Sequence, residues 1–216
     1  MGCVKRLLAG IGCLVVLAAA ALAGWVFRDR IAALYRRVRG LPEPAPVVYA
    51  MPASGGAARA AARLGELARP GGPAYVDLSA GDLATLIDQQ LARVPRHAFD
   101  SVEVALGDQR IRVRGTLDVS VLPRSLLGPL VQGLGRHEPV VAGGALSVPA
   151  GGHAMWTIDE LAIRDFPFPK SVIPAIVGAL HVPDARGAAV PIPLPALVGD
   201  VRVSPTRVRV YRAGAR

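Results

Sequence analysis

The side chains that could do acid–base or metal chemistry are scattered along this chain of 216 residues. No two of its histidines stand at the short spacing of a zinc-binding pair, so no metal centre is predicted. The adjacent His137 and Glu138 could act as acid and base, but glycines and prolines flank them and suggest a loop, and His153 follows two glycines as a turn residue would. Both cysteines, Cys3 and Cys13, lie in or before the first apolar run, so the rest of the chain has no thiol nucleophile. The four histidines are His97, His137, His153 and His181.

The carboxylates and arginines do not form a catalytic pattern either. Asp159 and Glu160 are adjacent, and neighbours in a regular strand point to opposite faces, so two carboxylates acting on one substrate are not indicated. The sequence has no GxSxG, P-loop or GxGxxG motif. We therefore expect no enzyme activity and no cofactor.

Two rows of arginines on predicted strands raise the question of an anionic partner. They are not interleaved with the stacking aromatics that single-stranded RNA binders use, so a nucleic-acid partner is not expected. A solvated strand face is the simpler interpretation, and contact with lipid headgroups is the alternative. The rows are Arg110, Arg112 and Arg114, and Arg207, Arg209 and Arg212.

The N-terminal apolar run, Leu7 to Phe27, carries no charge. At about 1.5 Å per residue it gives roughly 32 Å of helix, enough to cross a bilayer core. Trp25 stands near its end, where interfacial aromatics gather. We expect an N-terminal membrane anchor within residues 1–30, although the small residues Ala21 to Ala23 would also fit the cleavage site of a signal peptide.

A basic cluster follows the apolar run and makes the orientation ambiguous. Anionic headgroups attract such clusters with about 1 kcal/mol per residue, but a plain stop-transfer flank has the same composition. Counting Lys and Arg on the two sides places the rest of the chain in the cytoplasm, whereas the short basic tail at Lys5 and Arg6 resembles an export signal. The cluster consists of Arg28, Arg30, Arg36, Arg37 and Arg39.

The remaining chain divides into a linker and one domain. Residues 31–56 combine the basic segment with a stretch rich in Pro, Ala and Gly, and residues 57–216 alternate amphipathic helices with paired strands. Hairpins connect the strands, which predicts an α+β domain with a curved antiparallel sheet wrapped around or packed on the helices. The expected helices are 57–69, 79–94, 123–136 and 171–180, and the expected strands are 74–78, 101–106, 111–121, 144–148, 153–163 and 201–211.

Two of these strands have further predicted features. Apolar residues alternate with polar ones from Ile111 to Val121. In the strand 153–163 the alternation shifts phase near Glu160, which indicates a bulge. The three prolines within the segment Val190 to Pro195 predict a sheet edge or an extended rim.

The apolar faces of these elements are mostly aliphatic, with few aromatic side chains. The chain is 52% hydrophobic but only 5% aromatic, so Ala, Val and Leu supply most of the apolar area. These surfaces could form an ordinary core or line a groove for acyl chains, and the pattern alone leaves both possibilities open. The residues expected to line a groove are Leu83, Leu86, Ile87, Val113, Leu117, Val119, Leu126, Leu130, Trp156, Ile158 and Ile176.

Three runs resemble small membrane-anchored bacterial relatives of the tubular lipid-binding (TULIP-like) proteins. They are "YVDLSAGDLATLIDQQL", "SVEVALGDQRIRVRGTLDVSV" and "MWTIDELAIRDFPFPKSVIPAIVGAL", and the likeness covers roughly residues 74–212. The resemblance implies a helix lying in a strongly curved antiparallel sheet, a concavity that binds lipid, and a domain exported across the membrane. This is why we expect the extracytoplasmic orientation.

The sequence thus predicts a membrane-anchored, extracytoplasmic module that binds lipid or another apolar ligand. Each buried CH₂ would contribute about 0.8 kcal/mol. The alternative from another class is a scaffold or assembly subunit that binds a protein partner through a sheet edge or the Pro-rich rim.

Overall fold

The computed structural model describes residues 47–92, 98–128, 133–149, 154–192 and 194–214. Contacts divide the chain into two units, 1–46 and 47–216. The expected anchor, the basic cluster and the first part of the linker lie outside the described residues, as does Leu130. The second unit begins with Val47, and the backbone of Ala50 pairs with Val104, so the last part of the expected linker packs with the domain.

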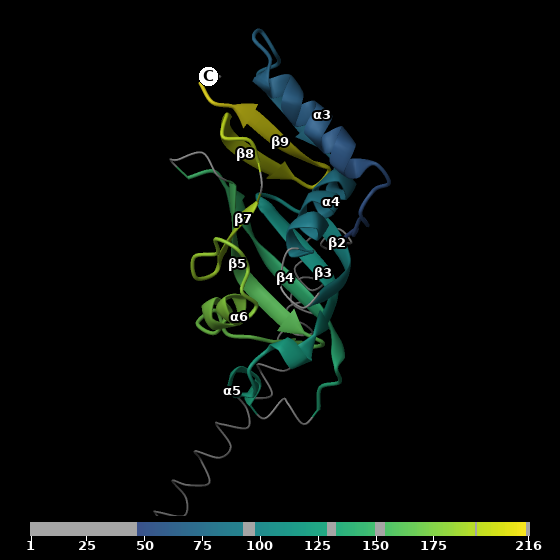
Figure 1. The fold of residues 1–216 in the computed structure, drawn as a ribbon, viewed down its shortest axis with the longest axis vertical. Coiled ribbons are helices and arrows are strands. Elements are labelled where there is room, and N and C mark those ends of the chain that lie inside the picture. The colour runs from purple at the N-terminus through teal and green to yellow at the C-terminus, as the bar shows by residue number, and fades with distance from the viewer. Residues whose placement is uncertain (1–46, 93–97, 129–132, 150–153, 193, 215–216) are drawn as a thin grey trace, which may run out of the picture. The chain divides into compact units, whose positions relative to one another are not determined.

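The second unit is an α+β fold with antiparallel sheets, which confirms the predicted class (Figure 1). Its helices are α3 (Gly56–Ala68), α4 (Ala80–Leu91), α5 (Arg124–Leu127) and α6 (Ile173–Ala179). Its strands are β1 (Tyr75–Leu78), β2 (Phe99–Leu106), β3 (Arg110–Asp118), β4 (His137–Ser147), β5 (Ala154–Ile163), β6 (Phe166–Pro167), β7 (Ala189–Ile192), β8 (Val198–Ser204) and β9 (Arg207–Arg212).

The strands form two sheets. The smaller sheet has the order β1-β9-β8, and the larger has the order β2-β3-β4-β5-β6. β7 pairs with the first half of β5 while β6 pairs with its last two residues, so both short strands lie along the same strand. The smaller sheet therefore combines β1, which precedes the larger sheet in the chain, with the β8–β9 hairpin, which follows it.

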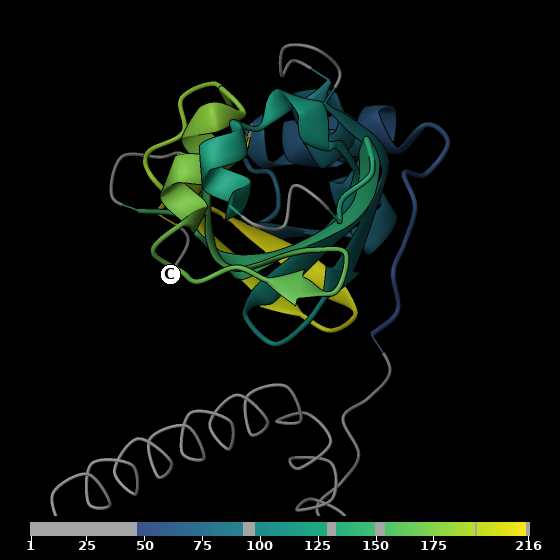
Figure 2. The ribbon, with the colours of Figure 1, turned by 90° about the horizontal axis from the view of Figure 1, so that it is seen from below.

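The helices cover the two sheets unequally. α3 runs along the smaller sheet, and α4 packs between α3 and β2 (Figure 1). Seen from below, the larger sheet curves strongly, with α6 on its concave side (Figure 2). One continuous cluster of buried, mostly aliphatic side chains includes residues of both sheets and of the helices.

The bulge predicted in the strand 153–163 is present. Gly143 of β4 pairs with Glu160 and Gly144 pairs with Ile158, so Asp159 is the additional residue. Trp156, Ile158, Leu161 and Ile163 all remain buried despite the change of phase. The expectation that Asp159 and Glu160 point to opposite faces is wrong, because the bulge lets both carboxylates reach arginines on the outer face of β3.

Several expected elements have other bounds in the structure, and the strand expected over 144–148 is the longer β4, His137–Ser147. The strand expected to reach Val121 ends at Asp118, whose side chain accepts a hydrogen bond from the backbone N–H of Ser120 and begins a 3₁₀ turn. The helix expected over 123–136 ends at Leu127, since Gly128 adopts a positive φ of 56°. The strand expected over 201–211 is the β8–β9 hairpin, with Pro205 in its turn.

Candidate functional site

An apolar cavity of about 70 Å³, measured over positions open to the centre of a water molecule, lies between the larger sheet and α6. Its walls are almost wholly aliphatic, and it is partly open. The inner face of β5 supplies one wall and α6 supplies another, while β3 and β4 contribute the floor. Its lining includes Val113, Leu117, Val140, Ala142, Trp156, Ile158, Leu161, Ile163, Ile173, Ile176 and Val177.

Little helix lies over this part of the sheet. α6 has only seven residues, with Pro174 in its first turn, where a missing backbone N–H costs little. The chain reaches it through a turn in which the N–H of Phe168 donates to the carbonyl of Leu161 and Phe168 packs edge-on against Phe166. α4 adds only its last residue, Leu91, to the cavity wall.

The structure brings together five of the expected groove residues, Val113, Leu117, Trp156, Ile158 and Ile176. The other described ones do not line the cavity. Leu83 and Ile87 are buried in α4, and Val119 is buried in the 3₁₀ turn. Leu86 and Leu126 are half-buried against the core.

Sequence reasoning did not assign several wall residues to the site. Leu161 and Ile163 continue the apolar row of β5 beyond the bulge, and Ile173 and Val177 share the apolar face of α6 with Ile176. Both signals were visible in the apolar spacing. Val140 was not predicted as a wall residue, because Pro139 and the glycines at 143 and 144 make the sequence of β4 resemble that of a loop.

Trp156 is the only described buried side chain with an unpartnered polar atom. The residue is 6% exposed, and its Nε1–H finds no acceptor within the described part of the chain. Its cross-strand neighbours, Leu146 and Val190, are both aliphatic. A buried Trp usually finds a hydrogen-bond partner for this group.

Arg114 lies at the margin of the cavity, but its charge is already engaged. The Nε of Arg114 donates to Glu103 over 2.8 Å, and its guanidinium stacks on the Tyr49 ring at 4.1 Å from the centroid. Among the described wall residues, no cation is therefore free to hold an anionic group.

The outer face of the larger sheet carries a ladder of ion pairs. Arg110 pairs with Asp159, and Arg112 pairs with Glu160 at 3.0 Å across the intervening Gly143. The hydrogen bond from Arg110 is the largest factor holding the pKa of the Asp159 carboxyl below its usual value. These side chains are about 40% exposed, so each pair contributes only about 0–1 kcal/mol. The carboxylates are engaged in the sheet and are not poised for acid–base chemistry.

The second arginine row is paired in the same way. Arg207 and Arg209 of β9 both donate to Asp77 of β1. The hydrogen bond from Arg209 is the main reason that the pKa of Asp77 lies below its ordinary value. Arg209 also stacks on the ring of Tyr75.

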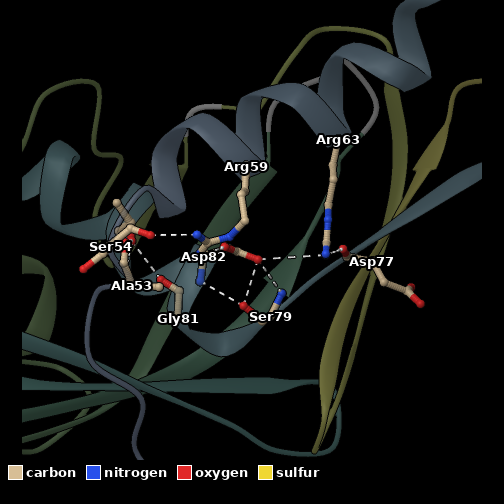
Figure 3. Close-up of polar contacts among 9 residues, drawn as sticks. Ala53, Ser54, Arg59, Arg63, Asp77, Ser79, Gly81 and Asp82 are labelled. Carbon is tan, nitrogen blue, oxygen red and sulfur yellow. Dashed lines mark hydrogen bonds and ion pairs between the residues drawn. The ribbon is translucent and has the colours of Figure 1, made fainter.

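At the start of α4, polar side chains form a cluster whose hydrogen bonds and ion pairs join its own members (Figure 3). The Ser79 hydroxyl accepts from the N–H of Asp82, and the Asp82 carboxylate accepts from the N–H and hydroxyl of Ser79. These reciprocal bonds form a capping box at the N-terminus of α4. Arg59 of α3 reaches Asp82 at 3.2 Å and Arg63 reaches it at 3.9 Å. The arrangement fastens α3 to α4, and its charged groups are engaged with one another.

The described histidines have no catalytic neighbours. The His181 ring contacts the carbonyl of Ala179, and His137 is exposed, whereas Glu138 is buried and accepts from the N–H of Gly135. His97 and His153 lie outside the described residues. Among the residues that the structure describes, no three His, Cys, Asp or Glu side chains gather as metal ligands.

No helix in the described part of the chain has the length and hydropathy to span a membrane. A scan against protein-family models gave no match, and neither curated proteins nor solved structures matched the chain. The function must therefore be argued from the cavity and its surroundings.

Proposed function

We propose that the domain binds lipid or another apolar ligand in the cavity beneath α6. The observation that carries this proposal is an aliphatic space that the protein's own side chains leave unfilled. Protein interiors normally pack with few voids larger than a water molecule. A partly open space with almost no polar wall favours an apolar occupant over water, because a buried water needs two to four polar partners.

Burial of methylene groups supplies the binding energy. At about 0.8 kcal/mol per CH₂, the few groups that fit inside contribute a few kcal/mol before the entropic cost of association. A space of about 70 Å³ is roughly half of one that holds a benzene, so the rest of a chain would extend through the open side of the cavity. The proposed ligand is therefore a single acyl chain, or one chain of a larger lipid.

The membrane placement is part of the same proposal. Leu7–Phe27 would hold the domain on the extracytoplasmic face of the cytoplasmic membrane, and the arginines from Arg28 to Arg39 would meet the headgroups. The resemblance to the tubular lipid-binding proteins supports this arrangement, since their lipid lies in the concavity of a curved sheet. A strongly curved sheet with its cavity on the concave side is compatible with that resemblance (Figure 2).

Native mass spectrometry of the purified full chain tests ligand binding. We expect co-purified lipid in the unmutated protein and much less in Ile158→Trp, because the larger ring fills the cavity. Thr157→Trp is the matched control, since Thr157 is the adjacent residue of β5 and is exposed. Lipid that is absent from the unmutated protein, or retained equally by both variants, would contradict the proposal. Absence would instead favour a scaffold role through the edge strand β7.

Cysteine labelling of intact cells tests the orientation. Ser54 is exposed, so Ser54→Cys introduces an accessible thiol once Cys3 and Cys13 have been replaced. We expect a membrane-impermeant maleimide to label intact cells. Labelling that requires lysis would place the domain in the cytoplasm, as the count of Lys and Arg suggests.

A further inference from the structure

The cavity wall that α6 supplies is attached to the rest of the domain more loosely than the walls formed by the strands. Residues 169–187, called the α6 strap below, connect β6 to β7, and both of these short strands pair with β5. β6 contributes two residue pairs and β7 contributes four, and each set includes a proline, Pro167 or Pro191, that has no backbone N–H to donate. By contrast, nine residue pairs join β3 to β4. The strap is therefore fixed along a single strand by two short pairings.

Between these two pairings, apolar contact holds the strap on the sheet. Within the described part of the chain, the hydrogen bonds of the strap join its own residues and Ala189. Its one ion pair there with the sheet is Lys170 Nζ with Asp159 at 3.7 Å, and such an exposed pair adds little stability. Ile173 and Ile176 of α6 are at most 2% exposed and line the cavity (Figure 2). Apolar contact is not directional, so an apolar ligand can cover these side chains in place of the sheet.

Residues suited to act as hinges lie between α6 and β7. His181 and Asp184 have positive φ angles of 51° and 57°, and Gly187 has a φ of 62°. The left-handed conformation is disfavoured for residues other than glycine, so a move of His181 and Asp184 out of it has little intrinsic cost. Domain and loop closures usually depend on a few such positions whose φ and ψ change. The strap therefore has both a weak attachment and a place to bend.

The size of the cavity gives a reason for movement, on the premise that an apolar ligand binds there as proposed. A space of about 70 Å³ is roughly half of one that holds a benzene, so only a few carbon atoms fit while the strap is in its present position. The strands cannot separate to enlarge it without breaking the hydrogen bonds of their ladders. The strap can shift outward while its own backbone hydrogen bonds remain intact.

We propose that the α6 strap is a lid, which moves away from β5 as an acyl chain enters and then covers the chain with the apolar face of α6. The structure corresponds to the closed position. Each ligand must displace the lid from the sheet, so the affinity depends on how firmly the closed position is held. The lid therefore controls both the size of the ligand that the cavity accepts and the strength of its binding.

A distance between two spin labels tests the movement in the full chain, kept in a rigid sterol-based detergent. With Cys3 and Cys13 replaced, the exposed positions Ala175 of α6 and Thr157 of β5 are changed to cysteine and labelled. Saturation with the neutral probe methyl octanoate should lengthen this distance by roughly 4 Å, the contact spacing of one additional layer of carbon atoms. A control pair at Thr157 and the exposed Asp88 of α4 should keep its distance.

Binding constants for the same probe give the second measurement. Lys170→Glu replaces the ion pair with Asp159 by repulsion, so it should weaken the closed position and raise the affinity roughly twofold to fivefold. Arg186→Glu is the matched control, because Arg186 is an exposed cation of the same strap that has no ion pair among the described residues. An unchanged distance in the saturated protein, or an affinity no higher in Lys170→Glu than in Arg186→Glu, would overturn the lid while leaving apolar binding intact. Failure of methyl octanoate to bind the unmutated protein would refute the proposed function itself.

Discussion

Two regions of the domain use the same aliphatic residues with different results. Around the smaller sheet, α3 packs against strands whose inner side chains are almost fully buried, including Leu78 and Val208 at 1% exposure. Neither of these two residues borders the cavity. On the concave side of the larger sheet, residues of the same types surround a cavity of about 70 Å³. Composition alone therefore does not decide whether a surface becomes a core or a binding site.

The difference follows from how much helix covers each sheet. α3, with 13 residues, runs along a sheet of three strands, and α4, with 12 residues, packs between α3 and the edge strand β2 of the larger sheet. α6, with seven residues, is the helix that covers the cavity side of a six-stranded sheet. A short helix leaves wall side chains without neighbours on one side, and those side chains lose dispersion energy.

Polar groups show the same contrast. In the closely packed region, the buried Asp82 carboxylate accepts hydrogen bonds from Ser79 and pairs with Arg59. In the cavity region, the buried N–H of Trp156 has no acceptor among the described residues. Buried polar groups are normally hydrogen-bonded, so Asp82 follows the rule and the indole N–H of Trp156 is an exception to it within the described residues.

The largest expected effect is the difference between two Leu→Ala substitutions. Truncation of a buried leucine costs about 2–5 kcal/mol, and the cost depends on how tightly the side chain is packed and on how far the site collapses. We expect Leu78→Ala to lie near the top of that range and Leu161→Ala near the bottom, because Leu161 already borders the cavity. Urea unfolding of the two variants measures both values. Equal losses of stability would mean that the two regions are packed alike.

A pair of Val→Leu substitutions sharpens the comparison from the opposite direction. Val208→Leu adds a methylene to a full core and should cost about 1–3 kcal/mol. Val113→Leu adds the same group beside the cavity and should be neutral or slightly stabilising, with reduced lipid uptake. Thermal midpoints and bound lipid are measured on the same samples. If Val113→Leu destabilises as much as Val208→Leu, the cavity is not available to a larger side chain.

Local patterns in the sequence predicted much of the fold. The alternation over Ile111 to Leu117 and the phase shift before Leu161 both correspond to elements of the structure. Each of these signals depends on neighbours within a few residues. Such interactions are specified by the local sequence and need no knowledge of the distant chain.

The rest depends on pairing and packing between distant segments. β1 pairs with β9, which lies more than 120 residues later, and hydropathy does not encode that choice of partner. β4 was mostly missed because Pro139 and two glycines hide a strand held on both sides by β3 and β5. The helix residues Leu83 and Ile87 were assigned to a groove because an apolar helix face does not indicate whether it will close a core or line a cavity.

The smallest expected effect concerns acid stability, and it separates the two regions by charge. Burial raises the pKa of Asp82, but hydrogen bonds from Ser79 and the charges of Arg59 and Arg63 outweigh this effect, so its pKa lies below the ordinary value. A carboxyl with a lowered folded-state pKa stabilises the fold fully above the unfolded pKa of about 3.9, and this contribution is lost as the pH falls through the folded value. Asp82→Asn should lower the free energy of unfolding by about 1 kcal/mol near neutral pH, and the stability of this variant should fall less steeply on acidification.

The exposed Asp88→Asn on the same helix is the control and should change stability little. Lipid binding in the cavity should be the same in both variants at neutral pH, because Arg114, the charged residue of the described wall, pairs with Glu103 and not with this cluster. A loss of binding in Asp82→Asn without loss of stability would show that the packed region controls the cavity.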